Sequence, residues 1–223
     1  MGMEEKKKQS AEKAYEIVKK SFNRDMVLGI GTGSTTNYFI EILIQEKLNL
    51  KGAVCSSNIS EEHLQMSNIE ILNLNDVHKI DVYVDGADEF NSRRELIKGG
   101  GGALTREKIL AHSSETFICI VDDSKYSNLL GNFPVPVEVI ELARSSISRE
   151  LMKMGGRPVY RNNFVTDNGN QIVDVHNLDL NVPYETEQKI NNIPGVIENG
   201  IFSSRKADIV LLATEDGVEE IKD

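Results

Sequence analysis

The sequence predicts an α/β protein with a mostly parallel sheet, helices on both faces of that sheet, and a smaller inserted α+β domain. Short apolar runs, typical of buried strands, alternate with helix-forming segments from the N-terminus to about residue 121. The prolines then gather between Pro134 and Pro194, where a second pattern of strands and helices begins. A last apolar run at 207–213 lies beyond that region, so the second pattern interrupts the first instead of following it.

Each element of the first part is predicted from its own apolar pattern. Segment 37–48 places Phe39, Leu43 and Ile44 on one side of a helix. Ser60 is a residue type that caps helices, so we expect it to open the next one. Near-continuous apolar runs indicate strands that are buried on both faces. We expect helices at 11–20, 37–48, 60–66 and 104–112, and strands at 26–30, 53–55, 69–72, 80–84 and 116–121.

The second part has the order βαββαβ, which is that of a ferredoxin-like module. Asn168-Gly169 is a strong hairpin signal because both residues tolerate positive φ. The run 207–213 is expected to return to the first, Rossmann-like sheet, so the predicted domains are 1–131 with 204–223, and the inserted 132–203. In the insertion we expect strands at 135–140, 157–164, 171–176 and 196–202, and helices at 143–154 and 184–192.

The composition argues against several classes of protein. A formal net charge of -10 disfavours a general nucleic-acid binder, because phosphate backbones recruit basic surfaces. No run of about 18 apolar residues is present, and the charged N-terminus lacks the apolar stretch of a signal peptide. We therefore expect no membrane partner and a cytoplasmic location. Cys55 and Cys119 are expected to be buried thiols in a reducing compartment, and Lys6-Lys7-Lys8 to lie on a solvated helix face.

The first strand is followed by a glycine- and hydroxyl-rich loop at 29–36, GIGTGSTT, that leads into a helix. Glycines let backbone N–H groups converge and a helix N-terminus favours negative charge, so the loop suits a phosphate. The candidate ligands are Thr32, Gly33, Ser34 and Thr35. A dinucleotide-binding fingerprint fails because its third glycine would fall at Ser34, and no Walker-type Gly-Lys-Ser/Thr follows. The alternative is a glycine turn that only allows tight strand-to-helix packing.

Asp85 and Asp88 follow the apolar strand 80–84, at the carboxyl end where open α/β sheets bind ligands. One hypothesis is a magnesium site, since carboxylates on one loop suit that ion. The other hypothesis, which we favour, is a sugar site, because carboxylates accept hydrogen bonds from hydroxyl groups. A solvated acidic loop is the remaining alternative.

Lys98, the four glycines at 99–102 and Glu107 form the densest group of chemically useful residues. A lysine can neutralise an oxyanion, and a bare backbone brings N–H donors close to it. A carboxylate shielded by apolar neighbours such as Leu104 can act as a general base. Near a helix N-terminus the same carboxylate also stabilises the helix, and spacing alone leaves both hypotheses open. Lys125, after the next strand, is a further candidate for binding ligand charge.

Seven segments of the chain resemble, in order, the motifs of the ribose-5-phosphate isomerase type A family. They cover nearly the whole sequence, which makes the resemblance specific. Two positions depart from the family pattern without changing a charged group: Thr105 stands where many relatives have an apolar residue, and Gly102 where some have alanine. The segments are GIGTGSTT at 29–36, DGADE at 85–89, KGGGGALTREK at 98–108, DDSK at 122–125, PVEV at 136–139, TDNGN at 166–170 and PGVIENGIF at 194–202.

The resemblance implies an aldose-ketose isomerase that interconverts D-ribose 5-phosphate and D-ribulose 5-phosphate in the non-oxidative branch of the pentose phosphate pathway. It implies that no cofactor or metal takes part, and that the chain assembles into homodimers or homotetramers. Glu107 matches the catalytic base, and Asp85, Asp88 and Lys98 are the groups expected to assist it. The implied substrate-binding residues are Thr32, Gly33, Ser34, Thr35, Asp85, Gly86, Ala87, Asp88, Lys98, Gly99, Gly100, Gly101 and Lys125.

Two other functions stay open as alternatives. A sugar-phosphate-binding sensor would share a related α/β fold, but only a short helix precedes the first strand, too little for a helix-turn-helix module. A coenzyme A transferase-like enzyme on a related fold would use a glutamate as its nucleophile. A glutamyl thioester, formed on incubation with an acyl-CoA, would distinguish that chemistry from isomerisation.

Overall fold

The computed structural model describes residues 2–222, and these form two compact units. Unit 1 comprises residues 2–86, 109–124 and 207–222. Unit 2 comprises residues 87–108 and 125–206. The chain therefore passes from unit 1 into unit 2 and back twice.

Unit 1 is built on a six-stranded sheet in the order β13-β12-β6-β3-β1-β2. The pairings are parallel except for that of β12 with β13. The predicted mostly parallel sheet is thus confirmed, and so is the return of the last apolar run to it. The strands are β1 (Val27–Ile30), β2 (Gly52–Cys55), β3 (Ile80–Asp85), β6 (Ser114–Asp122), β12 (Ile209–Thr214) and β13 (Gly217–Ile221).

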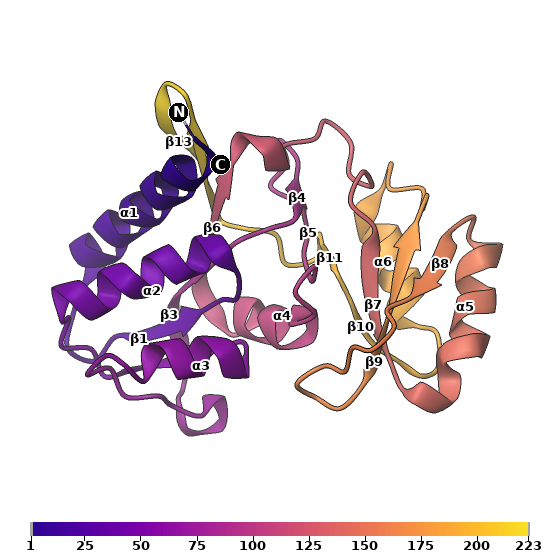
Figure 1. Cartoon of the computed structure of the whole chain (residues 1–223), viewed down its shortest axis with the longest axis horizontal. Helices are drawn as coiled ribbons and strands as arrows, with labels where there is room; N and C mark the ends of the chain where they lie inside the picture. The colour runs from indigo at the N-terminus through magenta and orange to yellow at the C-terminus, as the bar shows by residue number, and fades with distance from the viewer. Residues whose placement is uncertain (1, 223) are drawn as a thin grey trace. The chain divides into compact units, whose positions relative to one another are not determined.

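Helices α1 (Met3–Ser21), α2 (Ser34–Glu46) and α3 (Asn58–Leu64) share one apolar core with the sheet. Helices α1 and α2 lie side by side (Figure 1). Alternate strand residues such as Leu28 and Ile30 face this core, and full burial of such a side chain contributes about 1.5–3 kcal/mol. On the other face of the sheet, Tyr83 and Phe117 are buried too and their rings stack. Burial on both faces explains why the strand sequences are continuously apolar.

The strand order places a topological switch between β1 and β3. Strand β2 lies on one side of β1, whereas β3 lies on the other. The chain therefore leaves the carboxyl ends of β1 and β3 in opposite directions, which opens a crevice where such sheets bind ligands. The residues at this position are the loop that begins at Gly31 and the last residue of β3, Asp85.

Unit 2 contains a four-stranded antiparallel sheet in the order β10-β7-β9-β8. Two helices pack against it through an apolar core that includes Val137, Ile147 and Ile190. A three-stranded sheet, β11-β5-β4, completes the unit. The predicted βαββαβ order is confirmed. The elements are β7 (Val135–Val139), α5 (Arg144–Lys153), β8 (Arg157–Tyr160), β9 (Gln171–His176), α6 (Pro183–Asn191), β10 (Val196–Asn199), β4 (Glu89–Phe90), β5 (Leu96–Ile97) and β11 (Ile201–Phe202), while α4 (Leu104–His112) has residues in both units.

Two predictions in the first part of the chain were wrong in detail. The cap of α3 is Ser57, not Ser60, because the Ser57 hydroxyl accepts the backbone N–H of Ser60. The expected strand 69–72 forms a single bridge, between Ile71 and Ala53. It extends no further because Asn73 caps the 3-10 turn η1 (Leu74–Asp76), which redirects the chain.

Two predicted strands of the second part are shorter than expected. The strand predicted at 157–164 ends at Tyr160, and Asn163 adopts a φ of 56° that a strand does not allow. The strand predicted at 196–202 is divided at Gly200 into β10 and β11, which belong to different sheets. Strands β4, β5 and β11 have two residues each, too few to show an alternating pattern in the sequence.

The domain boundaries expected from the sequence, 1–131 with 204–223 and 132–203, stay a prediction. Within the described residues, contacts group 87–108 and 125–131 with unit 2. These are the segments that carry the glycine tract and the approach to β7. The compact unit is therefore larger than the ferredoxin-like module alone.

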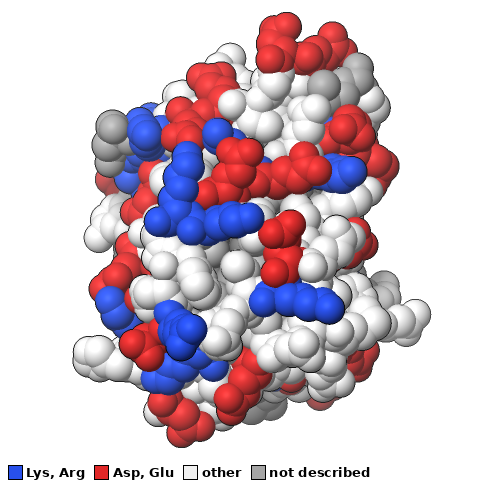
Figure 2. All heavy atoms as spheres, turned by 90° about the vertical axis from the view of Figure 1, so that its left-hand side faces the viewer, with Lys and Arg blue, Asp and Glu red and all other residues white. Residues whose placement is uncertain are grey.

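The face of unit 1 that carries α1 mixes charges of both signs (Figure 2). Lys7 pairs with Glu4 at 2.7 Å. Lys6, expected to be solvated, is instead 8% exposed and donates a hydrogen bond to Asp123 at 2.7 Å. That hydrogen bond raises the pKa of the Lys6 ammonium. The solvated-face prediction was thus wrong for Lys6, because α1 packs that side chain against unit 1.

Both cysteines are buried and free, as expected for unpaired thiols. Burial raises the pKa of the Cys55 thiol to about 12, because a thiolate is poorly solvated in the core. Among the described residues, no helix combines the length and the apolar character needed to cross a membrane.

Alkylation should test the burial of Cys55. At pH 8 a thiol with a pKa near 12 carries about a thousandfold less thiolate than one with its ordinary pKa, and the thiolate is the nucleophile. We expect iodoacetamide to modify native Cys55 at least about 100-fold more slowly than the same residue in guanidinium chloride. Mass spectrometry of peptides gives the rate. Equal rates in the two conditions would contradict the burial.

Candidate active site

In unit 1, the loop after β1 is fitted around Asp85. A Cβ on Gly31 would lie 1.9 Å from the Asp85 Cγ, so only glycine fits this position. The fully buried Asp85 carboxylate accepts the N–H groups of Thr32 at 3.0 Å and Gly86 at 2.7 Å, and a hydrogen bond from Tyr83. A buried carboxylate satisfied by several donors holds its surroundings rigidly. Asp85 therefore fixes the geometry of the loop.

Helix α2 begins directly in this loop, three residues earlier than predicted. Gly33, with a φ of 130°, precedes the first helical residue, and the first backbone bond runs from Asn37 N–H to the Gly33 carbonyl. The N–H groups of the first turn therefore have no partner within the helix. Ser34 is exposed and Thr35 is half-buried, so both hydroxyls lie at an end of the helix that favours anions.

A cluster of serines after β2 supports the loop, although the sequence predicted no part in the site for these residues and only a helix cap for Ser60. The Thr32 hydroxyl lies 2.8 Å from that of Ser56 and 2.7 Å from that of Ser57. Ser60 donates to the Gly31 carbonyl at 2.6 Å. The run SSNIS directly after the second strand was the available signal, because it places hydroxyls at the same sheet edge as the glycine loop.

In unit 2, Lys98 and Glu107 form a buried ion pair. The Lys98 Nζ lies 3.3 Å from the Glu107 Oε2, and the two side chains are 3% and 5% exposed. Glu107 lies in the first turn of α4, where its N–H bonds to the Ala103 carbonyl at 3.0 Å. Leu104, expected to shield it, is fully buried. The sequence-predicted base and oxyanion partner are thus brought together, away from solvent.

Three consecutive backbone carbonyls, of residues 199–201, bind the two segments of the chain that contain Lys98 and Glu107. The Gly200 carbonyl accepts the backbone N–H of Lys98 at 2.9 Å. The carbonyls on either side, of Asn199 and Ile201, both accept from Lys108 Nζ at 2.7 Å. Since Lys108 follows Glu107 on α4, the 199–201 segment bonds both to the backbone of Lys98, directly after β5, and to the helix of Glu107.

Phe202 and Gly200 complete this arrangement, and neither was assigned a role from the sequence. The ring of the fully buried Phe202 lies 5.7 Å from Lys98 Nζ and 4.9 Å from Lys108 Nζ, within the range of cation-π attraction. A Cβ on Gly200 would meet the Lys98 carbonyl at 2.2 Å. The motif PGVIENGIF contains both residues, but its sequence does not reveal which partners they contact.

The glycine tract lies between Asp88 and the loop before β9. Gly100 donates its N–H to Asp88 Oδ2 at 2.7 Å. Gly99 and Gly102 have φ values of 103° and 85°, which disfavour other residues. A Cβ on Gly102 would lie 2.1 Å from the Phe164 ring, so an alanine here, as in some relatives, requires a different ring position.

Thr105, which departs from the family pattern, contributes to a buried polar network. Its hydroxyl donates to Glu138, a fully buried residue of β7. The same carboxylate accepts hydrogen bonds from Thr166 at 2.8 Å, Asn168 at 3.1 Å and Asn170 at 2.8 Å. Full hydrogen bonding is what makes a buried carboxylate tolerable. The TDNGN turn is therefore bonded to the start of α4.

Glu89 and Lys125 have different surroundings. Glu89 is buried and accepts the N–H groups of Gly131 at 3.0 Å and Phe133 at 2.9 Å, so it organises a loop. Lys125 ends the 3-10 turn η2 (Asp123–Lys125) and is partly exposed. Residues 2–222 contain no cluster of three or more His, Cys, Asp or Glu side chains arranged to hold a metal ion.

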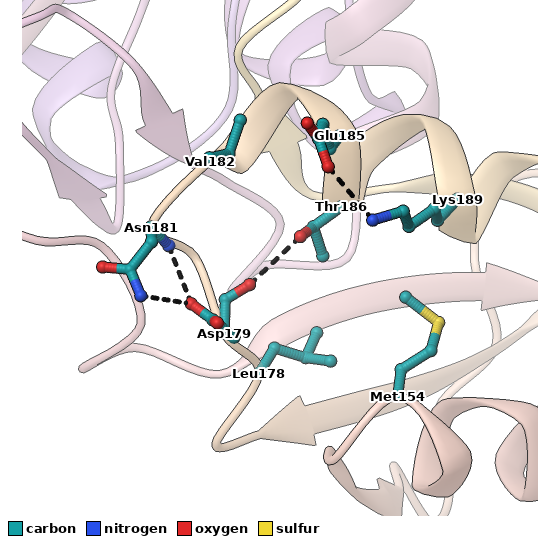
Figure 3. A pocket seen from close by; sticks show the side chains of 8 residues that line it. All are labelled: Met154, Leu178, Asp179, Asn181, Val182, Glu185, Thr186 and Lys189. Atoms are coloured by element: carbon teal, nitrogen blue, oxygen red, sulfur yellow. Dashed lines mark hydrogen bonds and ion pairs between the residues drawn. The ribbon is translucent and has the colours of Figure 1, made fainter.

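A surface hollow of about 260 Å³ lies beside α6 and involves none of the sequence-predicted residues (Figure 3). Its polar groups bond to one another: Asn181 donates to Asp179, Thr186 donates to the Asp179 carbonyl at 3.0 Å, and Lys189 pairs with Glu185 at 3.1 Å. The hollow thus carries no chemistry comparable with the Lys98–Glu107 pair.

Residues 52–217 match the family described as ribose 5-phosphate isomerase A (phosphoriboisomerase A). The chain belongs to this family. The motif-based resemblance is thereby confirmed, and the ribose 5-phosphate isomerase A family consists of aldose-ketose isomerases. The sequence-based alternatives of a sensor and of a coenzyme A transferase-like enzyme therefore give way to the isomerase.

Solved structures of ribose 5-phosphate isomerases are similar over the whole length. That of ribose 5-phosphate isomerase A from Neisseria gonorrhoeae is 48% identical, with a TM-score of 0.95 over 99% of this chain and 97% of that one. That from Methanocaldococcus jannaschii is 38% identical, with a TM-score of 0.91 over 100% of both chains. A D-ribose-5-phosphate isomerase in complex with phospho-erythronic acid is 40% identical, with a TM-score of 0.94 over 100% of both chains. The predicted fold class is confirmed.

Substitution of Gly31 by alanine should test the fit around Asp85. The added methyl group must displace the Asp85 carboxylate and its hydrogen bonds, so we expect the free energy of unfolding to fall by about 1–3 kcal/mol. Gly86→Ala is the matched control, because its Cβ would meet only the Ile120 carbonyl at 3.6 Å. Its stability should change by less than about 0.5 kcal/mol. Urea unfolding followed by circular dichroism measures the free energy of unfolding of both variants. If Gly31→Ala were as stable as Gly86→Ala, the proposed close fit of Gly31 against Asp85 would be contradicted.

Proposed function

We propose that this chain interconverts D-ribose 5-phosphate and D-ribulose 5-phosphate by proton transfer through an enediolate, with Glu107 as the base. The family membership supports the reaction, as part of the pentose phosphate pathway. The observation that carries the assignment of the base is the buried ion pair of Glu107 with Lys98 at 3.3 Å. A carboxylate that is paired with a cation and kept out of water is suited to removing a proton from carbon.

The proposed chemistry balances within the substrate. Glu107 removes the proton from C2 of the open-chain aldose, the electrons of that bond form the C1–C2 double bond, and the carbonyl electrons move to O1. The carboxyl group then returns the proton to C1, where the electrons of the C1–C2 double bond form the new C–H bond. The proton of O2 passes to O1 as O2 becomes the carbonyl, so O1 ends as a hydroxyl group. No electron or group leaves the substrate, so residues of the chain are sufficient for the proposed steps. A well-placed general base accelerates such a step by about 10²–10⁴-fold.

Lys98 is proposed to stabilise the enediolate as negative charge develops on oxygen. Its ammonium group is already desolvated, being 3% exposed, so it attracts an oxyanion more strongly than an exposed lysine would. Backbone N–H groups of 99–101 are proposed as further contacts to the substrate, with that of Gly101 directed to the oxyanion and that of Gly100 holding Asp88. Gly101 supports this role because a Cβ there would meet nothing within 4 Å, which leaves room for a ligand.

We assign ring opening to Asp88 and the organisation of the binding loop to Asp85. The Asp85 carboxylate is fully buried and accepts hydrogen bonds from four neighbours, including Thr36 at 3.3 Å. The Asp88 carboxylate is partly exposed and accepts the N–H of Gly100 at 2.7 Å. An accessible carboxylate is the better proton carrier for a ring oxygen. Gly86 and Ala87 connect the two.

The phosphate is proposed to bind at the N-terminus of α2. Orphan N–H groups there, together with Thr32, Gly33, Ser34 and Thr35, offer the donors that an anion requires. Lys125 is proposed to add positive charge. This assignment keeps the residues inferred from the sequence and adds the serine cluster of Ser56 and Ser57, which holds Thr32 in place.

We further propose a cytoplasmic homodimer or homotetramer. The resemblance to a family of such assemblies supports oligomerisation, as do exposed apolar side chains near one end of the four-stranded sheet. Leu142 is 95% exposed, Ile140 45% and Ile197 40%. Apolar side chains that lie together on a surface are typical of an interface.

Substitution of the proposed base should separate chemistry from binding. We expect Glu107→Gln to lower kcat for ribose 5-phosphate by about 10³-fold or more with KM within a few fold, and Glu107→Asp to lower it by about 10²-fold because the carboxylate is displaced. The control Glu150→Gln changes an exposed pair with Lys153 and should keep full activity. The assay follows ribulose 5-phosphate in the presence of EDTA, and thermal unfolding confirms that each variant is folded. Near-normal turnover of Glu107→Gln would remove Glu107 from this role.

Light scattering after size-exclusion chromatography should show a species of two or four chains. Leu142→Asp places a negative charge among the exposed apolar side chains of Ile140, Leu142 and Ile197. This variant should shift the oligomer towards the monomer. The exposed control Leu129→Asp should leave the assembly unchanged. A wild-type chain that elutes as a monomer at micromolar concentration would contradict the proposal.

A further inference from the structure

Arg161 lies in the segment after β8 and binds the backbone of the glycine tract. Its Nη1 lies 3.3 Å from the Gly99 carbonyl and 3.1 Å from the Gly100 carbonyl, and its Nη2 lies 3.3 Å from the Gly99 carbonyl. Asp174 of β9 holds the other edge of the guanidinium, through Nε at 2.9 Å and Nη2 at 2.5 Å. The guanidinium carbon also lies 5.2 Å from the Phe164 ring centroid. The side chain is 18% exposed, so these contacts are largely shielded from water.

Both bound carbonyls belong to trans peptides, and this determines where the matching N–H groups point. In a trans peptide the C=O and the N–H point in opposite directions. The peptide that binds Arg161 through the Gly99 carbonyl therefore directs the Gly100 N–H away from Arg161, and this N–H donates to Asp88 at 2.7 Å. The next peptide binds Arg161 through the Gly100 carbonyl and directs the Gly101 N–H away in the same manner.

We propose that Arg161 is a positioning residue of the isomerase: by binding the Gly99 and Gly100 carbonyls, it fixes the orientation and raises the donor strength of the Gly100 and Gly101 N–H groups. The first of these holds Asp88 and the second is presented to the developing oxyanion. This inference rests on the proposed roles of Asp88 and of the glycine tract. A hydrogen bond to a carbonyl polarises its peptide and strengthens the N–H on the opposite side.

A glycine tract needs such a partner because its own backbone has no preferred orientation. Glycine populates positive and negative φ about equally, so four in succession can present either face of each peptide. A preorganised donor costs no reorganisation during the reaction, whereas a mobile one does. Arg161 supplies the restraint from outside the tract, and Asp174 in turn restrains Arg161.

Arginine is suited to this role and lysine is not. The guanidinium offers five N–H donors in a rigid plane, enough for two carbonyls and a bidentate carboxylate together. A lysine ammonium is a point charge with three donors on a flexible stem. Positive charge alone therefore does not reproduce the arrangement. If Arg161 acted only through its charge, lysine could replace it, and this difference provides a test.

The test measures steady-state kinetics with ribose 5-phosphate for Arg161→Met, Arg161→Lys and Asp174→Asn. We expect Arg161→Met to lower kcat by about 10- to 100-fold with KM within about threefold, because oxyanion stabilisation is lost while binding of the phosphate remains. Arg161→Lys should recover less than a third of the loss in log kcat, and Asp174→Asn should show a smaller loss in the same direction. Arg149→Met, an exposed arginine of α5, is the matched control and should keep the wild-type kcat.

A double-mutant cycle with Asp88→Ala separates positioning from general destabilisation. If Arg161 acts through the peptide that holds Asp88, the double variant loses much less activity than the product of the two single losses. Multiplicative losses, full activity of Arg161→Lys, or an unchanged kcat in Arg161→Met would each overturn the inference. Should Arg161→Met not fold, Arg161→Lys and the cycle built on it decide the question. Failure of Glu107→Gln to lose activity would instead refute the proposed site itself, so the two failures are distinguishable.

Discussion

The buried ion pair of Lys98 with Glu107 is the interaction on which the rest of unit 2 depends. Burial of two charges is tolerated only when each has its partner, and loss of one partner leaves an uncompensated charge that costs about 3–5 kcal/mol. The two residues are nine positions apart, Lys98 directly after β5 and Glu107 in α4, so their backbones must be held at a fixed separation. The 199–201 carbonyls provide that restraint, because they bond to Lys98 on one element and to Lys108 on the other.

A second layer of polar contacts joins the ferredoxin-like module to the same elements. Glu138 of β7 is bonded to Thr105 at the start of α4, and Arg161 is bonded to Gly99 and Gly100. Each of these buried or shielded charges is satisfied by several partners, which is the condition under which a polar network adds rigidity. The module therefore supports the catalytic elements through directional bonds as well as through apolar packing.

Much of this molecule follows from the sequence, and the limits have physical causes. The βα alternation, the βαββαβ order and the helix at 104–112 follow from apolar periodicity, which is a local property. The roles of Arg161, Gly200 and Phe202 do not, because each depends on a partner many residues away, such as the Lys98 backbone for Gly200. Asp85 was correctly placed at a strand end, yet its enclosure by Thr32 and Tyr83 could not be seen from spacing. Lys6 was misjudged because a run of three lysines gives no sign that one of them packs against the fold.

Gly200 has a consequence for protein engineering. Its carbonyl bonds to Lys98, its N–H bonds to the Pro136 carbonyl at 2.8 Å, and no side chain fits beside it. One residue thus joins β7 of the module to the residue directly before the glycine tract. A chimera that exchanged the module between homologues would have to transplant the 199–202 segment together with its hydrogen-bond partners on both sides. The module therefore cannot be exchanged without also changing the segment that positions Lys98.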